Sequence, residues 1–270
     1  MTELHLLASD VSALDLASRL PTGDRITAIV VPGNRAGSEK VRRLRAAADR
    51  IGLPVFEHAR GAPLPGGLPP ASAAVSWFYS QILSAADIAR YPAGILNMHG
   101  GRLPDYRGAN VLHWAIINGE SELVVTWHEI VEAVDAGPIW FEERLPIPAD
   151  WTAWQARTAL LETAQRTFGT AWQRFRAGGR PLRIPDLRRG RVWPARKPSD
   201  GRIAAGMTQR QVRDLVRALC PPWPAAFVDS GGVPIPIARV TTTVQPDAIR
   251  YEAGDGATLY LVPATSNDRP

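Results

Sequence analysis

The sequence predicts an α/β protein, with a mostly parallel sheet flanked by helices and a smaller β-rich domain after it. Two observations predict this class. Short apolar runs alternate with helix-spaced amphipathic segments through the first 180 residues, and this alternation is typical of parallel sheets. Beyond residue 205, short strand-like runs are separated by Gly and Pro turns, a pattern typical of a small β-rich domain.

The elements of the first part follow from the spacing of apolar residues. Between 38 and 52, for example, Val41, Leu44, Ala48 and Ile51 recur at helical spacing with charged residues between them. The predicted strands cover 4–8, 25–31, 54–56, 73–79, 94–97, 123–130 and 139–145. The predicted helices cover 11–20, 38–52, 85–90, 109–118 and 150–177, with Asp150 as the N-cap of the last.

The composition is that of an ordinary globular protein. The chain has 270 residues, of which 45% are hydrophobic and 21% charged, so a disordered or fibrous chain is excluded. We expect a main domain over 1–180, a basic linker over 181–205 and a small C-terminal domain over 206–270. In that last domain, Thr208 opens a helix with an apolar stripe, and strands are expected at 235–240, 249–252 and 258–262.

Several classes of cofactor and location are disfavoured. No stretch is long and apolar enough to span a membrane, and the first residues lack the basic and apolar segments of an export signal. Cys220 is the one cysteine, which excludes an internal disulfide. No glycine-rich nucleotide motif follows a predicted strand, which argues against nicotinamide and ATP cofactors. We therefore expect a cytoplasmic protein with no membrane partner.

The charge is concentrated in one segment. The net charge is +5, and between Arg174 and Lys197 nine basic residues stand against the single acid Asp186. A solvated connection between domains is the simpler interpretation. The alternative is an electrostatic guide for a nucleotide-sugar diphosphate or for tRNA phosphates.

Chemistry-bearing side chains cluster after the apolar run at 94–97. Residues two apart on a strand share a face, so Asn97 and His99 should point to the same space, with Met98 turned away. The carboxyl end of such a strand is where α/β proteins bind ligands. An amide donor can stabilise an oxyanion and an imidazole can exchange a proton near neutral pH. Asp135, in a turn after the strand at 123–130, could hold that imidazole.

The stretches NMHGGRLPDYRGANVLHWAIINGE (97–120) and VVTWHEIVEAVDAGPIW (124–140) carry a resemblance. In order they contain Asn-x-His, a Leu-Pro-x-Tyr-Arg-Gly loop, a Trp-Ala-Ile helix, a strand with a histidine, and Asp-x-Gly-Pro-Ile. This pattern resembles the folate-dependent formyltransferase family, to which methionyl-tRNA formyltransferases belong. The resemblance implies a Rossmann-like catalytic domain, an OB-like C-terminal domain, and a formyltransferase of one-carbon metabolism with 10-formyltetrahydrofolate as donor.

Residue roles follow from the same resemblance. Asn97, His99 and Asp135 match the catalytic residues of the family. The folate would be enclosed by Tyr79, Gln81, Ile82, Leu83, Val131 and Ala133. We expect the acceptor to be bound by Ser9, Asp10, Gly101, Arg102 and Arg107, although Ser9 and Asp10 also suit helix capping, and Arg107 suits either a loop contact or a substrate anion.

One departure concerns the loop after His99. The chain has Gly100-Gly101-Arg102 where the family usually has a proline and a serine, so the acceptor pocket is expected to be reshaped. The segment ARKPSDGRI, followed by the proline-rich CPPWPAAF, resembles formyltransferases that act on nucleotide-linked amino sugars. A small-molecule amine, carried by a nucleotide sugar, is therefore the favoured acceptor. Methionyl-tRNA and a small amine of the hydroxyornithine kind remain alternatives.

Two further expectations concern histidines and assembly. His128 matches a family position on the strand that precedes Asp135, where it suits a structural role as well as a catalytic one. One asparagine, one histidine and one aspartate are a poor ligand set for zinc, so no metal is expected. A homodimer is compatible with the sequence.

Overall fold

A computed structural model describes residues 1–265. The chain forms two compact units, each built from separate stretches of sequence. The first unit contains residues 1–107, 124–143 and 162–191, and the second contains 108–123, 144–161 and the chain from 192 onward. The predicted ranges 1–180, 181–205 and 206–270 are a different kind of division, by motif, and stay a prediction.

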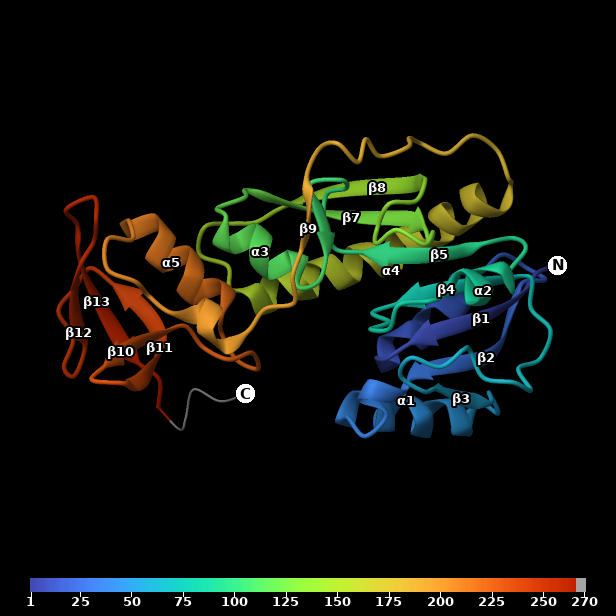
Figure 1. The fold of residues 1–270 in the computed structure, drawn as a ribbon, viewed down its shortest axis with the longest axis horizontal. Helices are drawn as coiled ribbons and strands as arrows, with labels where there is room; N and C mark the ends of the chain where they lie inside the picture. The colour runs from blue at the N-terminus through green and yellow to red at the C-terminus, as the bar shows by residue number, and fades with distance from the viewer. Residues whose placement is uncertain (266–270) are drawn as a thin grey trace. The chain divides into compact units, whose positions relative to one another are not determined.

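A seven-stranded sheet forms the centre of the first unit, in the order β3-β2-β1-β4-β5-β7-β8 (Figure 1). The first five of these strands pair in parallel, and β7 runs antiparallel to β5. The prediction of a mostly parallel sheet is thereby confirmed. The strands are β1 (Glu3–Ala8), β2 (Arg25–Pro32), β3 (Val55–His58), β4 (Ala73–Trp77), β5 (Ile95–His99), β7 (Glu122–Glu129) and β8 (Ile139–Pro146).

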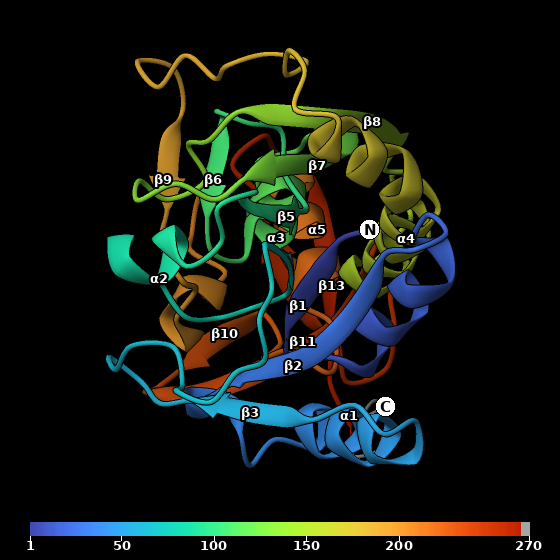
Figure 2. The ribbon, with the colours of Figure 1, turned by 90° about the vertical axis from the view of Figure 1, so that its right-hand side faces the viewer.

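Helices accompany this sheet, and α1 lies beside β3 (Figure 2). Asp10 caps the first helical segment, because its side chain accepts from the backbone N–H of Ser12. The helix predicted over 11–20 is thus present, and it is a 3₁₀-helix. The elements are η1 (Val11–Arg19), η2 (Gly33–Arg35), α1 (Glu39–Arg50), α2 (Ala85–Ala89) and α4 (Ala153–Arg176).

The start of α4 corrects one prediction. The N-cap of the helix is Thr152 and not Asp150. The Thr152 N–H donates to Gln155 Oε1 at 2.9 Å, and the Gln155 N–H donates to Thr152 Oγ1 at 3.5 Å. This reciprocal pair of hydrogen bonds satisfies two backbone N–H groups at the start of the helix. An aspartate two residues earlier does not make these bonds.

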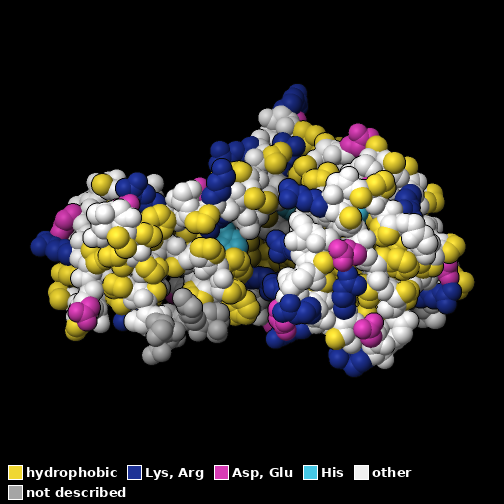
Figure 3. Space-filling view, turned by 60° about the horizontal axis from the view of Figure 1, so that its bottom comes forward, with side chains coloured by type: hydrophobic (Ala, Val, Ile, Leu, Met, Phe, Trp, Pro, Cys, Tyr) yellow, Lys and Arg dark blue, Asp and Glu magenta, His cyan; other side chains and the backbone are white. Residues whose placement is uncertain are grey.

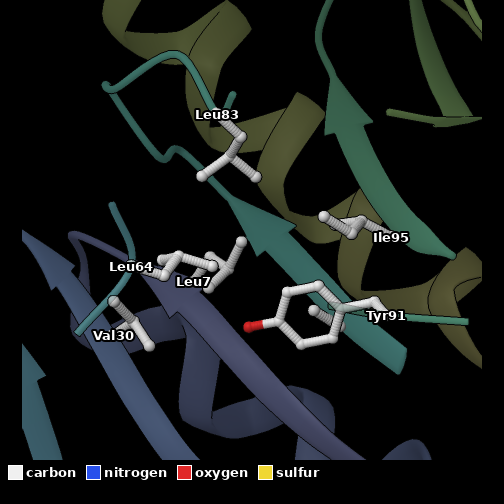
Figure 4. Packing of buried hydrophobic residues seen from close by; sticks show 7 residues of the cluster. Leu7, Val30, Leu64, Leu83, Tyr91 and Ile95 are labelled. Carbon is white, nitrogen blue, oxygen red and sulfur yellow. The ribbon is translucent and has the colours of Figure 1, made fainter. Parts of the chain in front are cut away.

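The core of the first unit explains why its strands read as continuous apolar runs. Leu7 of β1, Val30 of β2 and Ile95 of β5 pack with Leu64, Leu83 and Tyr91 (Figure 4). Tyr91 is 4% exposed, and its hydroxyl lies 3.0 Å from His5 Nδ1, whose other nitrogen donates to the carbonyl of Pro69. His5 is thus a bonded core residue, and burial lowers its pKa.

The second unit contains α3 and α5, together with a four-stranded antiparallel sheet of order β10-β11-β13-β12. The predicted C-terminal β-rich domain is thus confirmed. Thr208 opens α5 with a capping box, and its stripe of Val212, Leu215 and Val216 is buried. The elements are α3 (Val111–Ile117), η3 (Pro198–Gly201), α5 (Gln209–Ala218), β10 (Phe227–Ser230), β11 (Val233–Thr241), β12 (Ile249–Glu252) and β13 (Thr258–Pro263). A separate two-stranded sheet pairs β6 (Tyr106–Gly108) with β9 (Arg191–Trp193).

The surface is basic without being uniformly so. On the face shown in Figure 3, the Lys and Arg side chains lie among apolar and uncharged ones, and the acidic side chains are isolated. Within the basic segment, Arg183 pairs with Glu142 at 2.5 Å and Arg188 with Asp186 at 2.9 Å, so part of its charge is neutralised within the chain. Among residues 1–265, no helix has the length and apolar character that crossing a membrane requires.

Candidate active site

The site is built where β5 and β7 lie side by side in the first unit. The antiparallel register sets Asn97 opposite His128 and His99 opposite Thr126. Alternation along β5 turns Asn97 and His99 to one face, as predicted. The structure therefore brings a second histidine to the pair from a strand 31 residues away along the chain.

His128 fixes the orientation of Asn97. The Nδ1 of His128 lies 2.9 Å from the carbonyl oxygen of Glu129, which can only accept, so this nitrogen carries the proton. The Nε2 therefore has a free lone pair and accepts from Asn97 Nδ2 at 2.9 Å. One N–H of the Asn97 amide is used in this bond, and the other stays available as a donor.

Asp135 reaches both histidines from the turn after β7. Its Oδ2 lies 3.6 Å from His99 Nδ1 and its Oδ1 lies 3.4 Å from His128 Nε2. The backbone at Asp135 has φ 46, in the left-handed region that few residues other than Asn, Asp and Gly adopt. Gly137 holds the turn against β7, because a Cβ there would overlap the Glu129 carbonyl oxygen.

His99 is held by a backbone carbonyl as well. Its Nε2 donates to the Tyr106 carbonyl at 2.6 Å, so its Nδ1 is the nitrogen that faces Asp135. Burial lowers the pKa of His99, and the nearby Asp135 carboxylate opposes that shift. Burial therefore favours the neutral form of His99, and the Asp135 carboxylate favours the protonated form.

The glycines after His99 give this loop its path. A Cβ on Gly101 would come within 3.0 Å of His99 Nε2 and 2.9 Å of the Tyr106 carbonyl, and the Gly101 carbonyl accepts from Thr126 Oγ1 at 2.9 Å. The structure therefore places Gly101 as the support of His99. From the other side, Gly190 packs on the carbonyl of Pro104, which a Cβ at Gly190 would overlap.

The segment predicted to enclose the folate follows β4, at the same edge of the sheet. Leu83 is buried in the core cluster, and Ile82 is 75% exposed. Tyr79 donates to His58 Nδ1 at 2.6 Å, and burial raises the pKa of Tyr79. Gln81 donates to the His58 carbonyl at 2.5 Å, while its Oε1 is buried without a partner. An orphan acceptor at this edge is a feature that a ligand with N–H groups would satisfy.

The second predicted folate segment is the turn that carries Asp135. Ala133 is exposed, and Val131 and Val134 are 37% and 36% exposed. Large apolar side chains beside a buried polar cluster provide the mixed surface that small-molecule sites use.

The fold itself engages three of the predicted acceptor residues, Ser9, Asp10 and Arg102. Ser9 donates to the Phe78 carbonyl at 2.5 Å, and Asp10 caps η1 and lies 3.6 Å from Lys40. Arg102 pairs with Asp105 at 2.8 Å. The Nε of Arg107 is buried without a hydrogen-bond partner. A substrate role for these five positions, Gly101 included, stays a prediction.

The polar cluster also contains a potential metal-ligand set. Donor atoms of His99, His128 and Asp135 all lie within 4.8 Å of one another. The lone pair of His128 Nε2 already accepts from Asn97, so a cation would have to displace that bond. The expectation of a metal-free site was drawn from sequence without His128 and stays a prediction.

The profile of the family described as "Formyl transferase" matches residues 69–171 of this chain. The matched segment contains Asn97, His99, His128 and Asp135.

Solved structures share the fold at low sequence identity. An N-formyltransferase from Helicobacter canadensis, in complex with folinic acid and dTDP-3-aminofucose, has a TM-score of 0.73 at 16% identity, with 98% of this chain and 100% of that chain covered. Methionyl-tRNA formyltransferase from Clostridium thermocellum has a TM-score of 0.60 at 15% identity, with 98% and 100% covered. HypX from Aquifex aeolicus has a TM-score of 0.60 at 16% identity; 96% of this chain matches 43% of HypX. The chain thus spans less than half the length of HypX.

Proposed function

We propose that this protein transfers a formyl group from 10-formyltetrahydrofolate to the primary amine of a nucleotide-linked amino sugar. The observation that carries the reaction class is the arrangement of Asn97, the buried His99 and the half-buried Asp135 within the segment that matches the formyl transferase profile. An amide donor, a titratable imidazole and a carboxylate are the groups that acyl transfer to an amine requires.

The residues at this edge of the sheet fit a folate. Gln81 Oε1 is a buried acceptor without a partner, and a pterin offers N–H donors for such an atom. Ile82, Val131 and Val134 present apolar surface beside the cluster. The bound donor supplies the activated formyl group, and Gln81 with the turn at 131–135 would hold its ring.

In this proposal Asn97 stabilises the negative charge that develops on the formyl oxygen. Its free amide N–H is the donor, and His128 keeps that N–H pointed into the site by accepting the other one. His99, once protonated on Nδ1, adds a positive charge that stabilises the developing oxyanion. Because Tyr106 holds the opposite nitrogen, the proton on Nδ1 is directed toward Asp135.

Asp135 then has two tasks. Its carboxylate stabilises the imidazolium form of His99, which burial alone disfavours. It also accepts a proton from the acceptor nitrogen, which becomes positively charged when it attacks. The Asp135 side chain is 15% exposed. Its partial burial strengthens its electrostatic interactions, and its exposed part leaves it accessible to the acceptor.

The nucleotide sugar is favoured as the acceptor by two observations. The fold match to the sugar N-formyltransferase covers both chains almost completely, with a TM-score of 0.73 against 0.60 for the tRNA enzyme. In this chain the sequence from 195 to 203, ARKPSDGRI, also resembles sugar formyltransferases. Methionyl-tRNA is the second candidate, since the exposed arginines of the segment 174–197 would suit its phosphates.

The test is a tetrahydrofolate-release assay with 10-formyltetrahydrofolate and separate acceptors. The panel contains nucleotide-linked 3-amino and 4-amino sugars and initiator methionyl-tRNA. Turnover with a sugar and none with tRNA supports the proposal. Turnover with tRNA alone would make methionyl-tRNA, and not a sugar, the acceptor. Folate binding without turnover on any acceptor overturns the sugar assignment. An enzyme that neither binds the folate nor releases tetrahydrofolate overturns the reaction class.

A further inference from the structure

A cavity lies at the edge of the sheet opposite the one that holds the candidate active site. This cavity of about 510 Å³ is bordered by Thr2, Ala73 and Gly94, which stand at the amino ends of β1, β4 and β5. The residues of the candidate active site come from the carboxyl end of β5. The cavity lies within the first unit, and its volume is in the range of small-molecule sites.

The charges that border this cavity do not balance. Glu129 and Arg176 line it. Arg176 is already paired, because its Nη1 donates to Asp24 Oδ2 at 2.8 Å. Asp24 also accepts from the Thr2 N–H and from Trp172 Nε1, and its side chain is 1% exposed. The buried Asp24 carboxylate therefore neutralises the Arg176 charge.

Glu129 is different. Across residues 1–265, its carboxylate has no hydrogen bond and no ion pair. Its Oε1 lies 3.0 Å from the place where a Cβ on Gly94 would stand, so the carboxylate lies over that glycine, at the wall of the cavity. One uncompensated negative charge is left facing the hollow.

Aromatic rings form the adjacent wall. Trp140 and Phe175 line the cavity, and their ring centroids are 5.5 Å apart at an interplanar angle of 83°. The Trp140 Nε1 is buried without an acceptor. Ring faces attract organic cations, and a carboxylate beside them adds a charge partner.

We propose that this cavity binds a small organic ammonium ion, with its charge at Glu129 and its apolar body against Trp140 and Phe175. A lone carboxylate with aromatic walls does not provide the six to eight oxygens that calcium takes. A neutral apolar ligand would leave the Glu129 charge unpaired and desolvated, which is costly.

The test is isothermal titration calorimetry of the whole protein with choline and with its neutral carbon isostere, 3,3-dimethylbutan-1-ol. We expect choline to bind and the isostere to bind at least about tenfold more weakly. Glu129→Gln should weaken choline binding by a similar factor, while Glu162→Gln, the same change at an exposed position of α4 that does not line the cavity, should leave it unchanged.

Three results would overturn the proposal: no heat of binding with choline, equal affinity for choline and the isostere, or an unchanged affinity in Glu129→Gln. Thermal unfolding of Glu129→Gln serves as the folding check. If that variant is unstable, the comparison of choline with the isostere on the unmodified protein still decides, because the two differ only in charge. The result does not depend on whether the chain transfers formyl groups.

Discussion

Two buried histidines, His128 in the first unit and His113 in the second, are held in opposite ways. His128 is 1% exposed and both of its ring nitrogens are hydrogen-bonded. His113 is 6% exposed, and neither of its ring nitrogens has a hydrogen-bond partner among residues 1–265. The His113 ring meets Trp223 edge-on, with centroids 4.6 Å apart. Burial alone therefore does not decide how a histidine ring is held: hydrogen-bond partners fix the tautomer of His128, whereas His113 is held by packing.

The largest expected effect tests the His128 side of this comparison through Asn97. Asn97→Ala removes the donor that His128 orients, so turnover in the tetrahydrofolate-release assay should fall by about 10²- to 10³-fold. Asn118→Ala, an exposed asparagine of the second unit, is the matched control and should keep its activity. Near-normal turnover in a folded Asn97→Ala enzyme would contradict the proposed role.

The next effect tests His113 through the pH dependence of the free energy of unfolding. Burial lowers the pKa of His113 from 6.5 to about 4, with further lowering by Arg196 and Arg157. Between these values the unfolded chain binds a proton that the folded chain does not, so the stability present above pH 6.5 is lost as the pH falls toward 4. The loss amounts to roughly 3 kcal/mol.

Urea unfolding between pH 7 and pH 4 measures this loss. His113→Phe keeps an aromatic ring beside Trp223 and removes the titrating group, so its free energy of unfolding should depend less on pH in that window. If the variant and the unmodified protein lose stability in parallel, the pH dependence originates elsewhere.

A smaller effect sharpens the role of His128 itself. His128→Phe frees the Asn97 amide to rotate, and misplacement of such a group can cost up to about 100-fold in turnover. His128→Gln offers a carbonyl oxygen that can accept from Asn97 and should recover part of the rate. A shift in the pH profile of turnover should accompany His128→Phe, because His128 lies 3.4 Å from Asp135. A structural role alone would lower the amount of folded enzyme without shifting that profile.

The smallest effect is a gain. At neutral pH, His113→Phe replaces a buried ring without hydrogen bonds by an apolar one, so the free energy of unfolding should rise by roughly 1 kcal/mol. The same change at His5 breaks bonds to the Tyr91 hydroxyl and the Pro69 carbonyl, and should destabilise the protein by roughly 2 kcal/mol. Equal effects at both positions would erase the distinction.

Local sequence predicted the face that Asn97 and His99 share, because strand alternation is a local property. It also predicted the apolar stripe and the capping box of α5. It could not assign His128, because the residue meets Asn97 through an antiparallel register that no local pattern contains. The cap of α4 was misplaced for a similar reason: Asp150 and Thr152 are both good caps, and the reciprocal bond with Gln155 decides between them.

The division into two units could not be predicted either. Helix α4 is one unbroken helix in sequence, yet residues up to 161 belong to the second unit and residues from 162 to the first. Sequence patterns give elements and their order, whereas compactness depends on which elements pack together.

The contact of Gly190 with Pro104 allows proteolysis of the basic segment to report on the site. This segment is held at Arg183, through Glu142 and the Leu103 carbonyl, and again at Gly190 against the loop that supports His99. Between these anchors, Arg188 and Arg189 are exposed and offer trypsin its cleavage sites. Cleavage there requires this short span to open, so any ligand that steadies the loop at 101–106 slows the nicking. We therefore expect the rate of trypsin cleavage at Arg188 and Arg189 to report ligand binding at the candidate active site, without the need for turnover.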